Sequence, residues 1–346
     1  MIGLDIAKSV FQVHGEDAGG RVVVQRRLRR SQVKEFFAKL PPARIGIEAC
    51  GSAHYWGREL SALGHEVRLI PAAYVKPFVR RNKTDARDAA AICTALGRPD
   101  MRFVAVKSAE QQASRALERS RDLLVRQHTQ LMNSARSQLA EFGIVAAQGR
   151  RGFAELAAVV TAGVADGSAA VLALLLEVLR LLLRQIDQLA LAMALMERRI
   201  VAAARTNPAM RRLTTIPGVG PLTAHAVVTA IGEGRQFASA RDFAAWCGLT
   251  RRVDQSALTR RQHGISRQGD NGVRKLLVLG ASALLRQLRA SPERATEWQR
   301  GIFARRPVKV AVIAQAARNA RIAWALLQSG EPYQASRSRN QAAAAA

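Results

Sequence analysis

Four acidic residues in the first quarter of the chain have the types and spacing of a metal site. Asp5 lies in GLDIAK and Glu48 in GIEACG, and Asp85 and Asp88 both lie in KTDARDA. Residues three apart on a helix share one face. Clustered carboxylates repel one another unless a cation neutralises them. Mg²⁺ suits such a cluster, because it takes hard oxygen ligands and keeps waters for a substrate phosphate.

The chemistry expected of this cluster is phosphoryl transfer. Two metal ions about 4 Å apart stabilise both the attacking and the leaving oxygen of a displacement at phosphorus. Each acid alone has an equally good ordinary interpretation, because an Asp at a strand end is commonly a turn residue and Asp85 can cap a helix after Thr84. The four together, on a basic chain, are much more specific. Lys8, Lys83 and Arg87 nearby are either phosphate contacts or solvated surface.

The elements that must position these acids form an α/β pattern. Three antiparallel strands are predicted first, followed by strands that alternate with helices, which is the order of an RNase H-like fold. Strand ends and a helix start then meet at one edge of the sheet. Sugar kinases and actin-like ATPases begin similarly, but their Gly-rich phosphate loops are not visible here. The predicted strands are residues 1–7, 10–16, 21–27, 43–49 and 65–70, and the predicted helices are 31–40, 51–64 and 83–97.

The charge of the chain indicates a polyanionic partner. It has 53 Lys and Arg against 26 Asp and Glu, a formal net charge of +27. Such a protein usually binds nucleic acid by neutralising phosphates and releasing their counterions. A ribosome-associated or merely basic protein is the alternative. The three cysteines form no CxxC pair, which favours reduced thiols over a zinc site or a disulfide framework.

Export and membrane insertion are not expected. The chain opens on a strand pattern, MIGLDIA, in place of a basic segment followed by a long apolar one. Its most apolar stretch is interrupted by charges, which is typical of an amphipathic helix and not of a membrane span. We therefore expect a protein of the bacterial cytosol, bound at times to the nucleoid. The interrupting charges are Glu177, Arg180, Arg184 and Asp187.

The middle and the C-terminal part are predicted to be helical. Two long helices, residues 108–142 and 169–205, indicate a coiled-coil arm or a helical hairpin. Beyond residue 210, IPGVGP resembles a helix-hairpin-helix turn, in which Gly218 and Gly220 let backbone N–H groups face a phosphate; a plain turn between helices is the alternative. The predicted parts are an α/β domain (1–106), a coiled-coil region (107–207), a mainly α domain (208–335) and a disordered tail (336–346).

Ser256 lies inside a basic segment of the C-terminal part. A serine among arginines can attack a phosphodiester while the guanidinium groups stabilise the developing charge. Judged by chemistry alone, an ordinary loop hydroxyl or a phosphate hydrogen-bond donor is the more common role. The basic residues predicted to contact nucleic acid here are Arg251, Arg252, Arg260, Arg261, Arg267, Arg274 and Lys275.

Motifs along nearly the whole chain, in the right order, resemble a known family of proteins. The family is that of the DEDD transposases of the insertion-sequence one-ten type, and the GIS-x-x-GD form resembles its eleven-eleven subgroup. The matching segments are GLDIAK, IEACG, NKTDARDA, IPGVGPLTA, FASARDFAAWCGLT and GISRQGDNGVRKLLVLGA.

The resemblance implies a fold, a site and partners. It implies a RuvC-like N-terminal domain, a coiled-coil insertion and a C-terminal transposase domain. It implies that Asp5, Glu48, Asp85 and Asp88 bind Mg²⁺ and that Ser256 is a nucleophile forming a transient 5′-phosphoserine link. It also implies donor and target DNA, a structured guide ("bridge") RNA, and a homo-oligomer, from dimer to tetramer, in which one subunit's acids meet another's serine.

This sequence departs from the family pattern near the serine. Arg251 follows GLT where the family often has Pro, and Ala257 follows Ser256 where it often has Gly; Thr259 is the nearest other hydroxyl. Two other functions remain. In a RuvC-like nuclease or junction resolvase, the acids hydrolyse DNA and Ser256 only binds phosphate. In a basic binding protein without activity, loss of Asp5 changes nothing.

Overall fold

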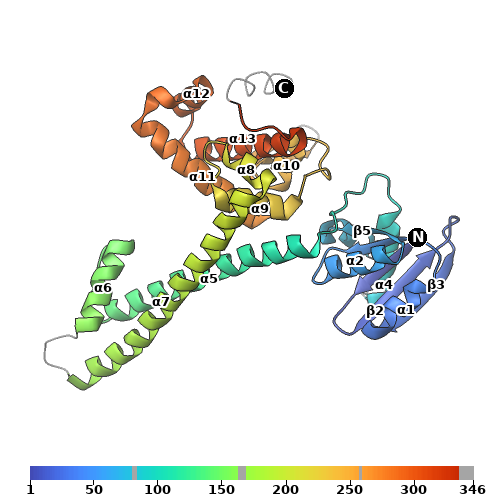
Figure 1. The fold of residues 1–346 in the computed structure, drawn as a ribbon, viewed down its shortest axis with the longest axis horizontal. Coiled ribbons are helices and arrows are strands. Elements are labelled where there is room, and N and C mark those ends of the chain that lie inside the picture. The colour runs from blue at the N-terminus through green and yellow to red at the C-terminus, as the bar shows by residue number, and fades with distance from the viewer. Residues whose placement is uncertain (80–83, 163–168, 257–258, 335–346) are drawn as a thin grey trace. The chain divides into compact units, whose positions relative to one another are not determined.

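The computed structural model describes residues 1–79, 84–162, 169–256 and 259–334 (Figure 1). The predicted tail, residues 336–346, lies outside them. The chain forms two compact units, which are described separately. The first is Met1–Ala113 with the short segment Gly234–Ala238, and the second comprises Ser114–Glu233 and Ser239–Ala346.

The first unit is built on a five-stranded mixed sheet in the order β3-β2-β1-β4-β5. The first three strands are antiparallel, and β4 and β5 run parallel to β1. Both the strand order along the chain and the mixed α/β class agree with the prediction. The strands are β1 (Ile2–Ile6), β2 (Val10–Glu16), β3 (Val22–Arg29), β4 (Arg44–Glu48) and β5 (Glu66–Ile70).

Helices cover both faces of this sheet. Alternate residues of a strand point to opposite faces, so Leu4 and Ile47 are buried with Phe37 and Trp56 on the side of α1 and α2. On the other side, Ile92 and its neighbours on α4 pack beneath Ile70. The helical segments are η1 (Arg30–Gln32), α1 (Val33–Ala38), α2 (Ala53–Ala62), α3 (Ala72–Val75), η2 (Lys76–Phe78) and α4 (Asp85–Leu96).

Helix α4 touches the backbone of β1 at Gly3. A Cβ added to Gly3 would lie 2.1 Å from the carbonyl oxygen of Ala89 and 2.5 Å from the backbone nitrogen of Cys93. The neighbouring strand repeats the arrangement less tightly, since a Cβ on Gly46 would lie 3.1 Å from Ile92. The two glycines therefore set the distance between α4 and the sheet.

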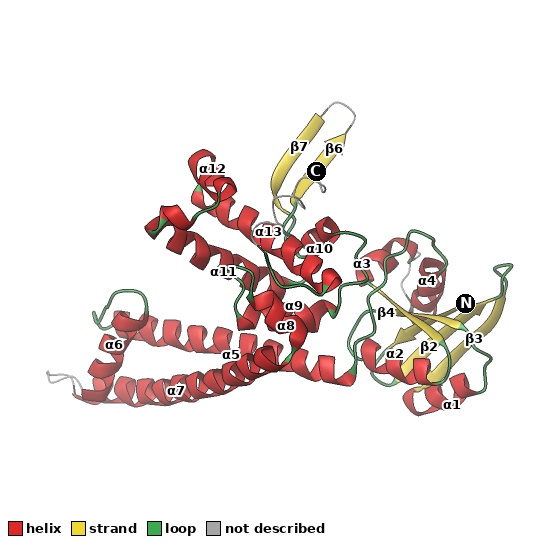
Figure 2. Ribbon diagram, turned by 45° about the horizontal axis from the view of Figure 1, so that its top comes forward, coloured by secondary structure: helices red, strands yellow, loops and turns green. Residues whose placement is uncertain are grey.

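The second unit begins with long helices. Helix α5 (Ala109–Ala140), whose first residues belong to the first unit, runs out to α6 (Arg150–Ala162), and α7 (Ala169–Thr206) returns beside it (Figure 2). These helices agree with the two long helices predicted. None of the helices in the described part of the chain has the length and apolar composition of a membrane span. The buried residues that join the far ends of the three helices are Ala135, Leu139, Leu156, Val160, Leu176 and Leu179.

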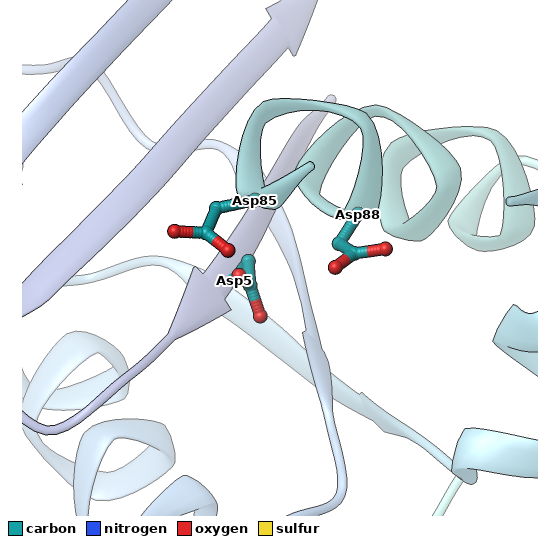
Figure 3. A group of neighbouring side chains, drawn as sticks. All are labelled: Asp5, Asp85 and Asp88. Atoms are coloured by element: carbon teal, nitrogen blue, oxygen red, sulfur yellow. The ribbon is translucent and has the colours of Figure 1, made fainter. Parts of the chain in front are cut away.

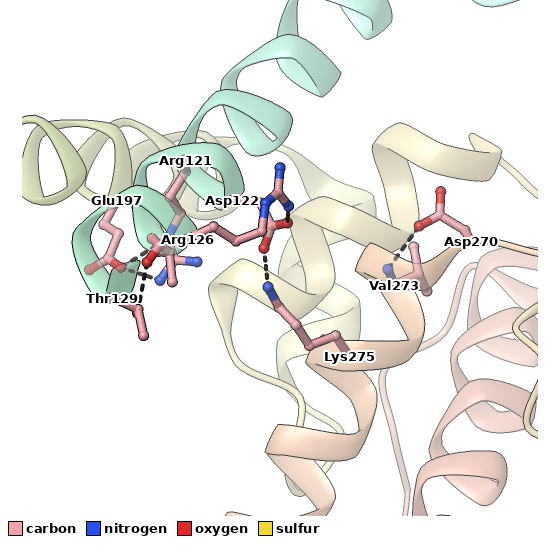
Figure 4. Close-up of polar contacts among 9 residues, drawn as sticks. Arg121, Asp122, Arg126, Thr129, Glu197, Asp270, Val273 and Lys275 are labelled. Atoms are coloured by element: carbon pink, nitrogen blue, oxygen red, sulfur yellow. Dashed lines mark hydrogen bonds and ion pairs between the residues drawn. The ribbon is translucent and has the colours of Figure 1, made fainter. Parts of the chain in front are cut away.

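Ion pairs connect α5 to α7 and to α11 (Asn271–Ala290) within this unit (Figure 4). The Arg121 Nε donates to Glu197 on α7 at 2.9 Å. Asp122 pairs with Lys275 on α11. A buried Arg115 pairs with Asp270, whose carboxylate also caps the start of α11 by accepting from a backbone N–H.

The remainder of the second unit is mainly helical, as predicted. One element was not predicted: β6 (Arg251–Ser256) and β7 (Thr259–Ile265) pair as an antiparallel hairpin. The sequence predicted a mainly helical domain with loops here, because the strands, RRVDQS and TRRQHGI, lack the apolar alternation of a half-buried strand. Their mutual backbone pairing supplies the structure instead. The other helices are α8 (Pro208–Thr214), α9 (Pro221–Ile231), α10 (Ala240–Trp246), η3 (Pro292–Arg294), α12 (Glu297–Arg305) and α13 (Val308–Ser329).

The contact at Gly3 gives a first testable expectation. Gly3→Ala should lower the free energy of unfolding by about 1–3 kcal/mol, the usual cost of overpacking, because α4 must move away from β1. Urea unfolding of the full chain measures this. Gly51→Ala is the matched control, since a Cβ there meets no atom within 4 Å. Equal stability of Gly3→Ala and Gly51→Ala would show that α4 tolerates the displacement.

Candidate active site

Three of the four predicted acids converge in the first unit. Asp5, Asp85 and Asp88 each offer one carboxylate oxygen, and these oxygens all lie within 4.8 Å of one another. Figure 3 shows the two aspartates of α4 projecting toward the Asp5 side chain on β1. Asp88 is buried, Asp5 is half-buried and Asp85 is exposed. The group therefore reaches from the protein interior to the surface.

The start of α4 explains the position of two of these acids. Thr84 is the N-cap of the helix, and its side-chain oxygen accepts the backbone N–H of Arg87. Asp85 and Asp88 consequently fall in the first turn and on one face. The positive end of the helix dipole stabilises carboxylates there. The alternative in which Asp85 caps the helix is therefore wrong, because the capping residue is Thr84.

The pleat of β1 explains the position of the third. Gly3 faces α4, and side chains two residues apart on a strand share a face. Asp5 therefore points to the side of the sheet that α4 covers. Because α4 approaches β1 so closely at Gly3, the first turn of the helix is brought over Asp5.

Glu48 lies at the same edge of the sheet but outside the 4.8 Å group. It ends β4, one residue beyond Ile47, which pairs with Leu4 of β1. Burial raises the pKa of the Cys50 thiol, and the negative charges of Glu48 and Asp5 raise it further. The carboxylates of Glu48 and Asp5 are thus both near enough to Cys50 for their charges to affect the pKa of its thiol.

The donor set fits a hard divalent cation. All three converging groups are carboxylates, which Mg²⁺ and similar ions prefer to nitrogen or sulfur ligands. An ion with oxygens at about 2.0–2.1 Å holds opposite ligands about 4 Å apart, close to the 4.8 Å that encloses the acids. Placing three carboxylates so near one another is unfavourable without such a positive charge.

The sheet register adds a cation that sequence reasoning did not single out. Asp5 pairs with Gln12 on β2, and Gln12 pairs with Arg27 on β3. Directly opposed residues of antiparallel strands point to the same face. Arg27, which is exposed, therefore shares the face of Asp5 two strands away. The run of polar residues around Arg27 was the available signal, but only the register relates Arg27 to the acids.

The predicted nucleophile lies on the new hairpin. Ser256 is the last residue of β6, and its backbone pairs with Thr259 at the start of β7. The side chains of Ser256, Thr259 and Arg260 lie outside the description, and so does Lys83 as a whole. The acids and Ser256 belong to different units.

Several predicted phosphate contacts are engaged within the protein. Arg274 donates to the carbonyl oxygens of Cys247 at 3.0 Å and Gln268 at 2.7 Å, so it holds two loop segments together. Lys275 pairs with Asp122. Arg252 pairs with Asp254 at 2.8 Å. The side chains of Arg87, Arg251, Arg261 and Arg267 are exposed or half-buried.

The glycine turn between α8 and α9 packs against other helices. Gly218 has a φ of +82°, and its carbonyl oxygen lies so close to α11 that a Cβ on Gly280 would be 1.9 Å from it. Asn319 on α13 donates to the carbonyl oxygen of Pro217 at 3.0 Å. Gly220, the N-cap of α9, is exposed and has space around it. Of the two predicted glycines, Gly218 thus has a packing role.

Comparison with known proteins agrees with this geometry. The sequence model of the DEDD transposases of IS110 type matches residues 2–144, and that of the transposase IS116/IS110/IS902 family matches residues 210–298. The chain belongs to the IS110 family of transposases. Members of this family are enzymes that cut and rejoin DNA, and this insertion-sequence transposase has an acidic cluster of Asp5, Asp85 and Asp88.

Similar proteins match over almost their entire length. A probable family 20 transposase of Pseudomonas aeruginosa is 46% identical over 96% of this chain and 98% of its own. The transposase of insertion sequence element IS1111A of Coxiella burnetii is 38% identical over 96% and 91%. The transposase of element IS1328 of Yersinia enterocolitica is 35% identical over 96% and 98%.

The thiol of Cys50 reports on the acids without any metal. Glu48→Gln and Asp5→Asn should each lower the pKa of Cys50 and so speed its alkylation at pH 8 by about twofold or more, because the thiolate is the nucleophile. Cys93 and Cys247 are buried, so mass spectrometry of the full chain in EDTA follows Cys50 selectively. Glu35→Gln on α1 is the control. Unchanged rates in both test variants would place the two carboxylates away from the thiol.

Proposed function

We propose that this transposase cuts and rejoins DNA with Mg²⁺ held by Asp5, Glu48, Asp85 and Asp88 and with Ser256 as the nucleophile. The observation that carries the proposal is the convergence of three carboxylates at one sheet edge. The strand order β3-β2-β1-β4-β5, with α4 on one face, supports an RNase H-like, RuvC-like first domain. In this assignment the acids are brought together by the fold and not by sequence proximity.

The acids have distinct parts in this proposal. Asp85 and Asp88, positioned by the capped first turn of α4, would hold the ion together with Asp5 of β1. Glu48, at the end of β4 on the same edge of the sheet, would be the fourth ligand. The bound ion supplies Lewis-acid stabilisation of the phosphoryl oxygens. Arg27, on the same face as Asp5, is placed to receive a neighbouring phosphate.

Ser256 would carry the covalent step. Its hydroxyl loses a proton, the Oγ–P bond forms, and the P–O3′ bond of the DNA strand breaks. The 3′ oxygen takes up a proton and departs, and the 5′ end of the strand stays joined to the serine as a phosphoserine. A 3′-hydroxyl later attacks this phosphoserine, which rejoins the DNA and releases the serine. Energy for rejoining is thereby conserved in the serine–phosphate bond. The exposed cations of the hairpin, Arg251 and Arg261, would neutralise phosphates beside it.

The partners follow from the same proposal. The net charge of +27 suits both DNA and a structured guide RNA. Because the acids and Ser256 belong to different units, a site assembled from two copies of the chain is a natural arrangement, and we propose a dimer or tetramer. The coiled-coil region at 107–207 would join the two domains, 1–106 and 208–335.

A covalent-adduct assay tests the nucleophile. The full chain is incubated with Mg²⁺, labelled DNA and RNA transcribed from the flanks of its gene, and then separated on a denaturing gel. Wild type should give a protein–DNA adduct that Ser256→Ala lacks, while Thr259→Ala should retain it. Asp5→Ala should abolish cleavage with DNA binding retained. Free cleaved DNA without adduct in every cleaving protein would instead indicate a hydrolytic nuclease or junction resolvase.

Melting temperature tests the metal independently of activity. Saturating Mg²⁺ should raise the melting temperature of the wild type, because an ion that binds only the folded chain stabilises it by about 2.7 kcal/mol at a hundred times its Kd. Asp88→Asn should lose this response. Glu35→Gln, an exposed acid elsewhere in the first unit, should keep it. A response of equal size in Asp88→Asn would remove that residue from the ligand set.

A further inference from the structure

The first unit also has a basic hollow of about 700 Å³ where β1 turns into β2. Four of its nine lining residues are cationic, and none of the described residues that line it is acidic. The hollow is formed by the β1–β2 turn, the end of β3 with the segment that follows, and the first turn of α2. Its lining residues are Lys8, Ser9, Val10, Arg29, Arg30, Ser31, Lys34, Tyr55 and Trp56.

The charges of the basic hollow are largely uncompensated. Lys34 pairs with Glu59. Across the described parts of the chain, no carboxylate lies within ion-pair distance of Lys8, Arg29 or Arg30. Three neighbouring cations without counter-charges repel one another, as the acids do. An anion that enters the hollow relieves this repulsion.

One of these cations is held in position by aromatic rings. The guanidinium carbon of Arg30 lies 5.3 Å from the ring centroid of Trp56 and 5.8 Å from that of Phe11. The backbone N–H of Arg30 donates to the carbonyl oxygen of Ser9 at 2.9 Å. Its donors are therefore fixed before any ligand binds, which lowers the entropic cost of binding.

The hollow also has an aromatic surface. Tyr55 is 40% exposed. Its ring is supported edge-on by the buried Trp56, with 5.3 Å between ring centroids and 80° between planes. Trp56 itself has an indole N–H without a hydrogen-bond partner within the described residues. Cations beside an exposed aromatic ring are the combination that binds single strands, since phosphates meet the cations and bases stack on the ring.

The hollow lies near the acids. Lys8 follows Asp5 by three residues, so their Cα atoms are at most about 11 Å apart even if the chain is fully extended. A strand of B-form DNA advances about 3.4 Å per nucleotide, so this distance corresponds to roughly three nucleotides. A strand that passes the acids can therefore reach the hollow.

We propose that the basic hollow binds an unpaired nucleotide of the DNA strand that is being cut, a few nucleotides from the phosphate at the acids. Lys8, Arg29 and Arg30 take its phosphates, and Tyr55 stacks on its base. The site favours unpaired over duplex DNA, because a base inside a duplex has no free face for Tyr55. The choice of DNA rests on the proposed function of the acids.

Binding measurements in EDTA test this proposal without cleavage. The full chain is titrated into labelled dT20, a 20-base-pair duplex and U20 RNA at several salt concentrations. Lys8→Ala/Arg29→Ala should raise the Kd for dT20 about tenfold and reduce the salt slope by about 1.4, as expected for two lost contacts to a single strand. Lys39→Ala/Arg44→Ala, with the same change in net charge outside the hollow, should leave both values near wild type.

Tyr55 distinguishes stacking from charge. Tyr55→Leu should raise the Kd for dT20 about tenfold with an unchanged salt slope, and Tyr55→Phe should bind as wild type. An oligonucleotide carrying 5-iodouracil should cross-link to Tyr55 on irradiation, and the cross-link should disappear in Lys8→Ala/Arg29→Ala. Normal melting temperatures of the variants exclude misfolding.

Three outcomes would overturn the proposal. The first is unchanged binding of dT20 by both Lys8→Ala/Arg29→Ala and Tyr55→Leu. The second is an equal loss of affinity for the duplex and for dT20. The third is a loss of affinity confined to U20, which would assign the hollow to RNA. Because these measurements use neither Mg²⁺ nor Ser256, their failure leaves the adduct assay unaffected. Failure of the adduct assay likewise leaves them unaffected.

Discussion

The close contact between α4 and β1 at Gly3 is the constraint on which the candidate site depends. Three carboxylates can be held near one another only by elements too rigid to separate, since their mutual repulsion favours opening the site. Gly3 and Gly46 permit a helix backbone to rest on a strand backbone, and the buried Ile92 fills the remaining space. Backbone packing thus opposes the repulsion, and a cation removes it.

Asp5 is the acid of the cluster that lies on the sheet. The Asp85 and Asp88 carboxylates approach it from α4, and Glu48 acts with it on Cys50 from the side of β4. Asp5 is therefore grouped with the two acids of α4 and also acts, with Glu48 of β4, on the thiol of Cys50. Around this negative point the chain is strongly positive, with Arg27 on the same face and the basic hollow at the same strand end. In the proposed function, these cations would attract a phosphate backbone toward the acids.

The sequence was sufficient for those features that repeat along one element. Strand alternation located β1 to β5, and the spacing of Asp85 and Asp88 placed both on one helix face. It was not sufficient where partners are distant in the chain. The hollow, for example, brings together Lys8, Arg29 and Tyr55 from three segments. The hairpin β6–β7 escaped prediction for a different reason, because it has no apolar face. Lys275 was predicted to contact phosphate because its ion-pair partner, Asp122, is 153 positions away, so the pair is not visible in the sequence.

In the proposed function, the acids and Ser256 come from different units, which limits how the reaction could be organised. The carboxylates are fixed by one unit, whereas the serine ends a strand of a two-stranded hairpin in the other. Besides its backbone pairing, the described part of the hairpin has exposed ion pairs of Asp254 with Arg252 and His263, and two-stranded hairpins are marginally stable on their own. Bound nucleic acid would neutralise Arg251 and Arg261 and so favour the ordered hairpin. In the proposed function, substrate binding would thereby order the strand that ends at Ser256, whereas the three converging acids are already positioned by β1 and α4.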